Sequence, residues 1–428
     1  MDFFKEELSG LPENAVCNHM KKVTVRHLLT MNTGQTDPED GLFLDRQKDW
    51  AVSFLTSPVE KEPGSWFVYN TRATYMLSVI VQKVTGERLF EYLKPRLFEP
   101  LGFSDGIWWE LSPQGYNTGG FGLNISVEDI ARFGIFVKGK GCYGGKQLLN
   151  AEWFEEATKS WSDSSNTWEG ENAMGYGYQY WMCRVPGTYR GDGAFGQYCV
   201  ILPMEDILFA STAGQLDMIK IADAFWDHIY TDVHEKKERE EQREQKEQKE
   251  QKGQKAQRLR VELGERLKSL VLPAFYEEKG IRGDEIMIPE FFLGKEFALE
   301  ENPLHISKLC FEKEPDGEGC RVRLTNGQNT DNFEVSAKGW KAGLLHLDGE
   351  STNLSQCVFR EGMYENFYVK GCTKGNVLYM DMLFEETSFQ DTWEITFEGE
   401  RIRVQVKRNT GFVPVDFDVY AYPMEGKG

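Results

Sequence analysis

The sequence lacks the patterns of a metal-binding or nucleic-acid-binding protein. Its 8 cysteines form no Cys-x-x-Cys pair and its 6 histidines are scattered, so the ligand spacing of a zinc site is absent. Positive charge is scarce, because 49 Lys and Arg face 68 Asp and Glu, for a net charge of -19. Such a chain repels the phosphates of nucleic acids and of anionic membranes. We therefore expect no metal, no cofactor, no nucleic-acid partner and no membrane partner.

Long hydrophobic runs are also missing. No stretch is long and apolar enough for a membrane span, and the amino terminus has no signal-peptide pattern. As written, the chain is expected to be cytoplasmic and reduced. It would be exported only if the true start of the protein lay upstream and carried a signal.

Residues 235–257 contain almost no apolar side chains and repeat Glu, Gln and Lys. Such a segment cannot join a core, and it predicts a charged linker or a solvated helix. No apolar heptad runs through it, which argues against a coiled coil. We expect three parts: a first domain over 1–234, a linker over 235–260 and a second domain over 261–428.

The stretch Pro63–Gly86 is the most informative part of the first domain. Apolar residues follow Tyr69 at helical spacing, Asn70 or Thr71 can cap the helix, and Gly86 can end it. A phenol placed just before a buried helix is where a proton-transferring tyrosine could stand. Core packing is the alternative role for such an aromatic residue.

The remaining elements predict an α+β fold, with helices over 89–97, 127–138 and 217–230 and three consecutive strands between 176 and 214. The glycines at 119–122 lack the lysine of a phosphate-binding loop and predict close backbone packing. After the linker, alternating segments predict an antiparallel β-sandwich or barrel over 289–424, with a turn at 398–400.

Five stretches together resemble the serine hydrolases related to β-lactamases and penicillin-binding proteins, in a class C-like branch that includes esterases and D-aminopeptidases. Tyr69-Asn70-Thr71 is similar to the family's second motif, Tyr-x-Asn, with Thr71 in place of the asparagine. The other four, in the family's order, are 23–34, 97–102, 119–134 and 193–198. The resemblance implies a β-lactamase/transpeptidase-like domain with an incomplete antiparallel sheet. The all-β domain is similar to one found at the carboxyl end of some bacterial members.

The resemblance also implies acyl transfer from a small-molecule or peptide substrate to a serine in Ser-x-x-Lys, with the motif tyrosine assisting the proton relay. No serine of this chain has a lysine three residues later. By resemblance, Tyr69 is the expected proton relay, and Asn70 and Thr71 are expected to contact substrate. At the third motif, Arg190, Asp192 and Gly193 are expected to border it. Arg190 would attract a substrate carboxylate or, alternatively, be a solvated turn residue.

Three hypotheses remain open at this point. The chain is an amino-terminally truncated serine hydrolase, a non-catalytic pseudoenzyme that binds a peptide or cell-wall-like ligand, or a binding module centred on the β domain. We expect no turnover by the chain as written. Without the family's first strands we also expect an apolar groove and an exposed strand edge within 176–214, through which the chain could associate with another.

Overall fold

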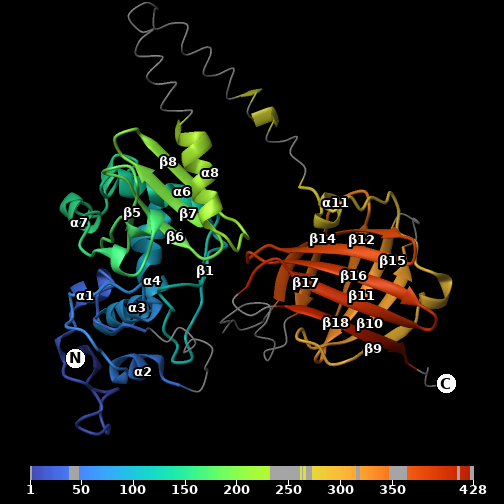
Figure 1. Ribbon diagram of the computed structural model, residues 1–428, viewed down its shortest axis with the longest axis horizontal. Helices are drawn as coiled ribbons and strands as arrows, with labels where there is room; N and C mark the ends of the chain where they lie inside the picture. The colour runs from blue at the N-terminus through green and yellow to red at the C-terminus, as the bar shows by residue number, and fades with distance from the viewer. Residues whose placement is uncertain are drawn as a thin grey trace, which may run out of the picture. The chain divides into compact units, whose positions relative to one another are not determined.

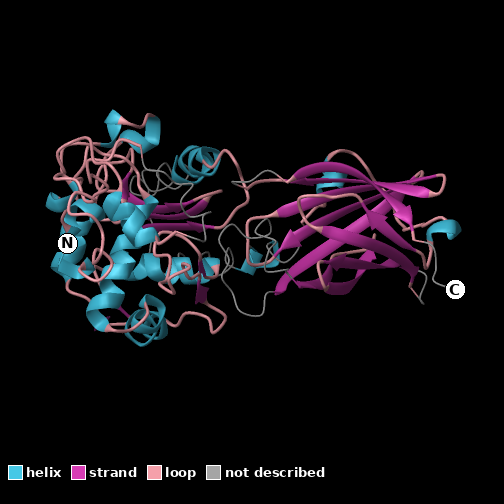
Figure 2. Ribbon diagram, turned by 90° about the horizontal axis from the view of Figure 1, so that it is seen from below, coloured by secondary structure: helices cyan, strands magenta, loops and turns pink. Residues whose placement is uncertain are grey.

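The computed structural model describes residues 2–37, 48–231, 261–262, 264–266, 272–314, 319–346, 364–411 and 415–424. The chain divides into two compact units, Met1–Ala213 and Gly214–Ser351 with Tyr364–Gly428. Helices and loops predominate in the first unit and strands in the second (Figure 1, Figure 2). The predicted linker over 235–260 lies outside the described residues. The domain bounds proposed from the sequence stay predictions.

The first unit consists of short helices around one longer helix, together with short strands. Its α-helices are α1 (Val25–Leu29), α2 (Trp50–Thr56), α3 (Thr71–Thr85), α4 (Leu89–Leu93), α5 (Glu99–Leu101), α6 (Val127–Lys138) and α7 (Ala151–Ala157). Its strands are β1 (Trp108–Trp109), β2 (Leu123–Asn124), β3 (Cys142–Tyr143), β4 (Lys146–Gln147), β5 (Trp181–Met182), β6 (Tyr189–Gly193), β7 (Gln197–Leu202) and β8 (Ile207–Ser211).

Helix α3 forms where the sequence predicts it. Asn70 is its N-cap, and Gly86 ends it in the left-handed conformation at φ 74°, which glycine adopts without steric cost. The buried side of α3 includes Tyr75, Met76 and Val79, which join α1 and α2 in one hydrophobic core. The helix predicted over 127–138 is confirmed as α6, with Ser126 as its N-cap.

The second core of the first unit lies between α6 and a four-stranded antiparallel sheet of order β5-β6-β7-β8. The expectation of three consecutive strands is corrected to four. The expected first strand is reduced to β5 because Gly177 approaches the backbone of Ala157 and the chain turns at Gln179, where φ is 65°. The segment 193–198 is a hairpin turn between β6 and β7, with Phe195 at φ 69°.

The second unit is built from long strands. They are β9 (Glu296–Leu299), β10 (Ile306–Lys313), β11 (Gly319–Asn326), β12 (Asn329–Ser336), β13 (Lys341–His346), β14 (Tyr364–Lys374), β15 (Val377–Phe384), β16 (Gln390–Glu398), β17 (Arg401–Arg408) and β18 (Asp416–Pro423). The short helix α11 (Phe275–Glu278) precedes them. The helix predicted over 217–230 is present as α8 (Ile219–Ala224) followed by a π-helical turn over Phe225–Tyr230.

These strands form one antiparallel sheet of order β12-β11-β10-β9-β18-β17-β16-β15-β14-β13. The two end strands of this order, β12 and β13, lie next to each other, so the sheet is curled. The contact between them includes the backbone N–H of His346 on β13, which donates to the Asp331 carboxylate on β12 at 2.7 Å. Phe311 and Phe397, from strands well separated in the order, also meet inside, with ring centroids 5.6 Å apart. The result is barrel-like, and the predicted α+β fold followed by an all-β domain is confirmed.

The strand alternation predicted from the sequence is also confirmed. Ile402, Val404 and Val406 on β17 are buried, whereas their neighbours are partly exposed. The hairpin between β16 and β17 turns at Gly399, where φ is 56°. Every second residue of each strand therefore faces the interior of the sheet. A polar residue at one of these positions is placed in the interior as well.

Candidate functional site

The start of α3 fixes the position of the motif tyrosine. The side-chain oxygen of Asn70 accepts from the backbone N–H of Ala73 at 3.2 Å, and its amide donates to Gln35 Oε1 at 2.7 Å. Asn70 is only 1% exposed. Its side chain therefore holds the helix start and the segment before α2 together, and it presents no polar atom to a ligand in solution.

Tyr69 lies half-buried just before this cap. Its ring stacks on Trp181 of β5, with centroids 5.5 Å apart and an interplanar angle of 20°. It also lies edge-on to Tyr176, with centroids 6.3 Å apart. These contacts bring the tyrosine of the second motif from the helical part of the unit to the first strand of the sheet.

Trp181 continues the connection from β5 to β6. The guanidinium of Arg190 lies over its ring, 5.6 Å from the centroid, and the same guanidinium donates to the carboxylate of Asp192 at 2.9 Å. The structure therefore unites Tyr69, Arg190 and Asp192, three of the predicted site residues, around one tryptophan. We refer to Tyr69, Tyr176, Trp181, Arg190 and Asp192 as the Tyr69 cluster.

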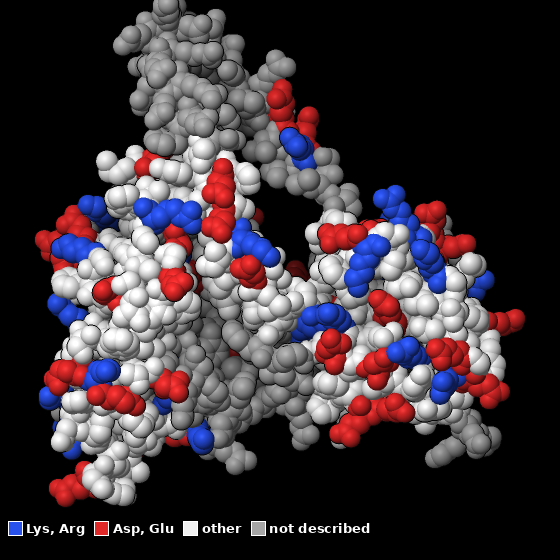
Figure 3. Space-filling model, viewed as in Figure 1, with Lys and Arg blue, Asp and Glu red and all other residues white. Residues whose placement is uncertain are grey.

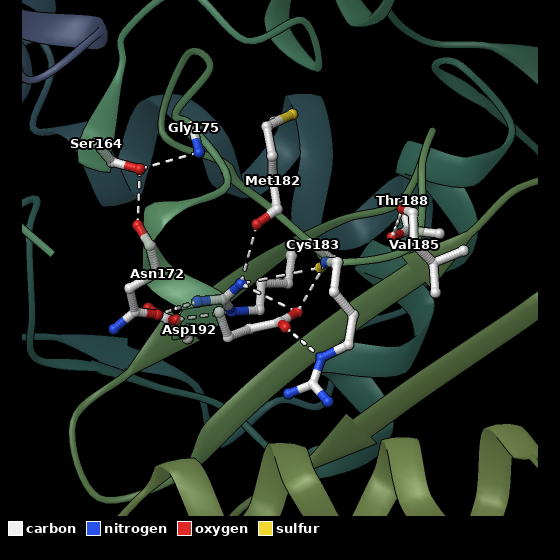
Figure 4. Close-up of polar contacts among 11 residues, drawn as sticks. Ser164, Asn172, Gly175, Met182, Cys183, Val185, Thr188 and Asp192 are labelled. Atoms are coloured by element: carbon white, nitrogen blue, oxygen red, sulfur yellow. Dashed lines mark hydrogen bonds and ion pairs between the residues drawn. The ribbon is translucent and has the colours of Figure 1, made fainter. Parts of the chain in front are cut away.

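Arg190 is buried, with 1% of its surface exposed, and its guanidinium is fully engaged within the protein. It donates through Nε to Asp192 at 2.9 Å, through Nη1 to the backbone carbonyl of Met182 at 3.2 Å and through Nη2 to the side-chain oxygen of Asn172 (Figure 4). Its Nη1 also lies 3.8 Å from Glu171. The solvated-turn alternative is therefore wrong, and a substrate carboxylate would have to displace internal partners to reach this cation.

Glu171 and Asn172 belong to a 3-10 turn over Gly170–Ala173 that the sequence did not single out. The Glu171 carboxylate accepts from Arg184 Nε at 2.5 Å and from the Arg184 backbone N–H at 3.2 Å. No motif or spacing connects this turn with β6, so only the tertiary structure could reveal that it neutralises Arg190. Glu171, Asn172 and Arg184 are the polar partners that sequence reasoning missed.

Burial governs the ionisation of the Tyr69 cluster. Burial raises the pKa of Asp192 above its usual range, although the Arg190 guanidinium opposes the shift. Burial likewise raises the pKa of Tyr176 well above its ordinary value. The pKa of the nearby Cys183 thiol is raised to about 11 by burial, so its thiolate is scarce at neutral pH and it is a poor nucleophile.

The buried serines of this region already have hydrogen-bond partners. Ser164 donates to the backbone carbonyl of Asn172 at 2.7 Å and accepts from the N–H of Gly175 at 2.9 Å (Figure 4). Ser162 donates to the carbonyl of Thr30 and accepts from Asn32. Neither hydroxyl is paired with a lysine or histidine that could take its proton, which is what activates a serine for acyl transfer.

The two remaining predicted residues lie in other surroundings. Thr71 packs against the glycine-rich turn, since a Cβ at Gly120 would lie 2.8 Å from the Thr71 methyl group. Gly119 approaches Ser78 of α3 in the same way, at 2.7 Å. The prediction that these glycines serve close packing is confirmed. Gly193 ends β6 opposite Gln197 at the start of the hairpin turn.

In the described residues no group of three or more His, Cys, Asp and Glu side chains is placed to hold a metal ion. Across the same part of the chain, every helix is too short or too polar to cross a membrane.

The comparisons with known proteins point to one family. The family model described as Beta-lactamase matches residues 13–218. No curated protein matches the chain. Similar solved structures include a proposed 6-aminohexanoate-dimer hydrolase from Bacillus anthracis, 23% identical, covering 55% of this chain and 66% of that one with a TM-score of 0.41. Another is the octameric penicillin-binding protein homologue from Pyrococcus abyssi, 15% identical, covering 93% and 78% with a TM-score of 0.38.

A penicillin-binding protein from Bacillus halodurans is 18% identical over 48% of this chain and 73% of its own, with a TM-score of 0.37. This chain spans slightly less than two thirds of the Bacillus anthracis protein. At TM-scores below 0.5 these likenesses carry no inference about substrate or mechanism. The finding that identifies this part of the chain is the family-model match: residues 13–218, with the motifs inside them, match the beta-lactamase family.

Proposed function

We propose that the first unit carries the tyrosine side of a hydrolase site for ester or amide bonds, including those of D-amino-acid peptides. In this proposal Tyr69 transfers the proton during acyl transfer. The observation that carries it is the stacking of Tyr69 on Trp181, whose ring also lies under the guanidinium of Arg190 on the third-motif strand. Two motifs that are distant in sequence thus border one place, as an acyl-transfer site requires.

Arg190 has a positioning role in this proposal, in place of the predicted contact with a substrate carboxylate. Its buried guanidinium pairs with Asp192 and lies over Trp181, so it holds the surface on which Tyr69 stacks. Asn70 is likewise a positioning residue, because its polar atoms are used in the cap of α3. Gly193 and Thr71 stay predicted substrate contacts.

We further propose that the 428 residues by themselves do not form an acyl-enzyme. They contain no Ser-x-x-Lys. Near the Tyr69 cluster, the hydroxyls of Ser162 and Ser164 donate hydrogen bonds to backbone carbonyls, and burial raises the pKa of the Cys183 thiol. A chromogenic β-lactam and short-chain nitrophenyl esters test this proposal directly. We expect no turnover by the purified chain, and no covalent adduct by mass spectrometry after exposure to a penicillin or a fluorophosphonate.

Either an adduct or sustained turnover would overturn the proposed lack of activity. The Tyr69→Phe variant then decides the site. If turnover falls about a hundredfold or more in Tyr69→Phe, the assignment of Tyr69 as the proton relay is correct and only the nucleophile was missed. If turnover is unchanged, the reaction occurs elsewhere in the chain and the Tyr69 cluster is not the active site.

Binding without turnover is the second candidate function, for a peptide or cell-wall-like ligand. It is supported by Trp168, which is 41% exposed and lies edge-on to Trp181 with centroids 5.8 Å apart. Trp181 thus joins an exposed tryptophan to the half-buried Tyr69, and such rings offer an apolar surface with a polar tip.

Calorimetric titration with a D-alanyl-D-alanine peptide tests this candidate. We expect Trp168→Ala to weaken binding by about threefold or more. The matched control is Trp153→Ala, since Trp153 is 42% exposed but contacts Tyr178, at a tilted angle, in a separate aromatic group. Equal effects of the two variants, or no binding by the wild-type chain, would exclude this candidate.

A further inference from the structure

One end of the interior of the second unit's sheet is polar. Glu365 on β14 shares the buried face of its strand with Phe367 and Val369. Asp391 on β16 lies opposite Arg408 on β17 in the strand register. Because alternate residues point to the same side of a strand, these three charged side chains lie on the inward face, near one end of their strands. Away from this end, a row of ring contacts joins Phe297 to Phe292, Phe292 to Phe397 and Phe397 to Phe311.

Asp391 and Arg408 compensate each other. Arg408 donates through Nε to one carboxylate oxygen at 2.6 Å and through Nη2 to the other at 2.8 Å, and each side chain is 1% exposed. The guanidinium also lies over the rings of Phe384 and Phe389, 5.7 Å and 4.5 Å from their centroids. This pair has the two-point geometry that makes a buried ion pair tolerable.

Glu365 has no such partner. It is 3% exposed, and neither of its carboxylate oxygens makes a hydrogen bond of normal geometry, although the Thr387 hydroxyl is near enough to lower its pKa. Trp393 Nε1 and Thr410 Oγ1, which are 2% and 5% exposed as residues, also lack partners. Buried polar atoms are nearly always hydrogen-bonded, so a buried carboxylate with both oxygens lacking a partner requires an explanation.

We propose that this end of the sheet interior binds a small organic cation, a primary ammonium on a short apolar chain, with its N–H groups donating to the Glu365 carboxylate. The charges favour a cation, because two carboxylates face one guanidinium and a single positive charge completes the balance. The rings of Phe384 and Phe389 favour both a cation and an apolar chain.

The proposal predicts that binding of the ammonium releases a proton and that the affinity depends on pH. Burial raises the pKa of Glu365 to about 8, so the empty site holds a proton there at neutral pH. Binding of an ammonium ion replaces that proton. Besides Glu365, the charged groups that act at this end are Asp391, Arg408 and Glu386, together with the Asp331–His346 pair where β12 meets β13. Affinity for the ammonium should therefore rise between pH 6 and pH 8, by about tenfold per pH unit at most.

The test is calorimetric titration of the full chain with n-hexylamine at pH 7, in two buffers of different ionisation enthalpy. We expect saturable 1:1 binding with release of close to one proton. n-Hexanol and hexanoate, which lack the positive charge, should not bind. In Glu365→Gln, binding should weaken by roughly ten- to a hundredfold, because the ammonium loses a charged acceptor.

Glu400→Gln is the matched control, because Glu400 is an exposed glutamate in the turn between β16 and β17. It should bind n-hexylamine like the wild type, and both variants should keep the wild-type circular dichroism spectrum. Equal weakening in the two variants, equal binding of n-hexanol, or no binding of n-hexylamine by the wild type would overturn the proposal. A crystal structure of the soaked protein with only ordered water beside Glu365 would overturn it as well.

Discussion

Buried polar side chains determine much of what single residues do in this protein. Asn70, Arg190 and Asp391 are each almost completely buried, and each has its polar atoms matched by partners within the chain. Glu365 is buried to the same degree without a matching donor. A matched buried group stabilises and positions its neighbours, whereas an unmatched one costs free energy unless a ligand, a water or a proton compensates it.

Asn70 offers the first prediction at this scale. Asn70→Ala removes the cap of α3 and the hydrogen bond to Gln35, so the free energy of unfolding should fall by about 2–4 kcal/mol. Asn150→Ala is the control, since Asn150 caps α7 at an exposed position, and it should cost about 1 kcal/mol or less. Urea denaturation measures both. A similar, small loss in the two variants would mean that the burial of Asn70 contributes nothing beyond the cap.

Glu365 offers the second prediction at this scale, which concerns the pH dependence of stability. Its pKa is raised from 4.5 in the unfolded chain to about 8 in the folded protein, because burial disfavours the charged form. The folded state then holds more protons than the unfolded state between these values, so its contribution to stability is complete below pH 4.5 and is lost as the pH rises to about 8.

The Glu365→Gln variant cannot ionise there. Relative to the wild type, its free energy of unfolding should therefore increase from pH 5 to pH 8.5, by at least about 1 kcal/mol. Denaturation curves at the two pH values, with Glu400→Gln as the control, measure this difference. A variant whose stability runs parallel to that of the wild type at all pH values would show that Glu365 ionises normally.

At the scale of elements, the four-stranded sheet of the first unit has a helix packed on β7 and β8 and an edge at β8. α6 packs against β7 and β8, and Gly134 allows the close approach, because a Cβ there would lie 2.3 Å from Leu208. Within the described residues β8 is hydrogen-bonded to a neighbouring strand on its β7 side only. An edge strand with free backbone groups is a template for pairing with another chain.

The edge of β8 predicts self-association. Ile207→Lys introduces a charge at this edge and should weaken association of the chain by about tenfold, as a charged side chain on an edge strand opposes pairing. Met204→Lys is the control, because Met204 is 84% exposed but lies in the turn before β8. Light scattering over a concentration series measures both. A wild-type chain that stays monomeric, or equal effects of the two variants, would contradict association through this edge.

At the scale of the whole molecule, the chain combines two compact units of different architecture. The face of the molecule in Figure 3 carries acidic and basic side chains intermixed, without a large basic patch, in agreement with the net charge of -19. Each unit has its own hydrophobic core, so each should unfold as its own cooperative unit.

Calorimetric unfolding tests this independence. We expect two transitions, with Asn70→Ala lowering the midpoint of one of them by about 5 °C or more and leaving the other unchanged. Raising the pH from 5 to 8.5 should destabilise the other transition through Glu365, and Glu365→Gln should reduce that effect. A single transition shifted by both variants would mean that the two units unfold together.

The sequence by itself determined the features that depend on near neighbours in the chain. The bounds and caps of α3 and α6, the alternation of β17 and the turn at Gly399 follow from capping residues and from periods of 3.6 and 2. The family motifs and the lack of Ser-x-x-Lys are also readable without coordinates. The short β5 and the hairpin after Gly193 were not predicted, since close approaches of Gly177 and left-handed residues decided them.

Only the tertiary structure decided how the polar residues are used. Arg190 was expected to meet a substrate or solvent, but Glu171 and Asn172 arrive from a separate turn and engage it. Tyr69 meets Trp181 although more than a hundred residues separate them in the chain. Glu365 gave no signal in the sequence, because its burial depends on how the sheet is assembled. Periodicity predicts which face of a strand is buried, whereas the partners of a buried charge come from strands and turns whose distance is set by the fold.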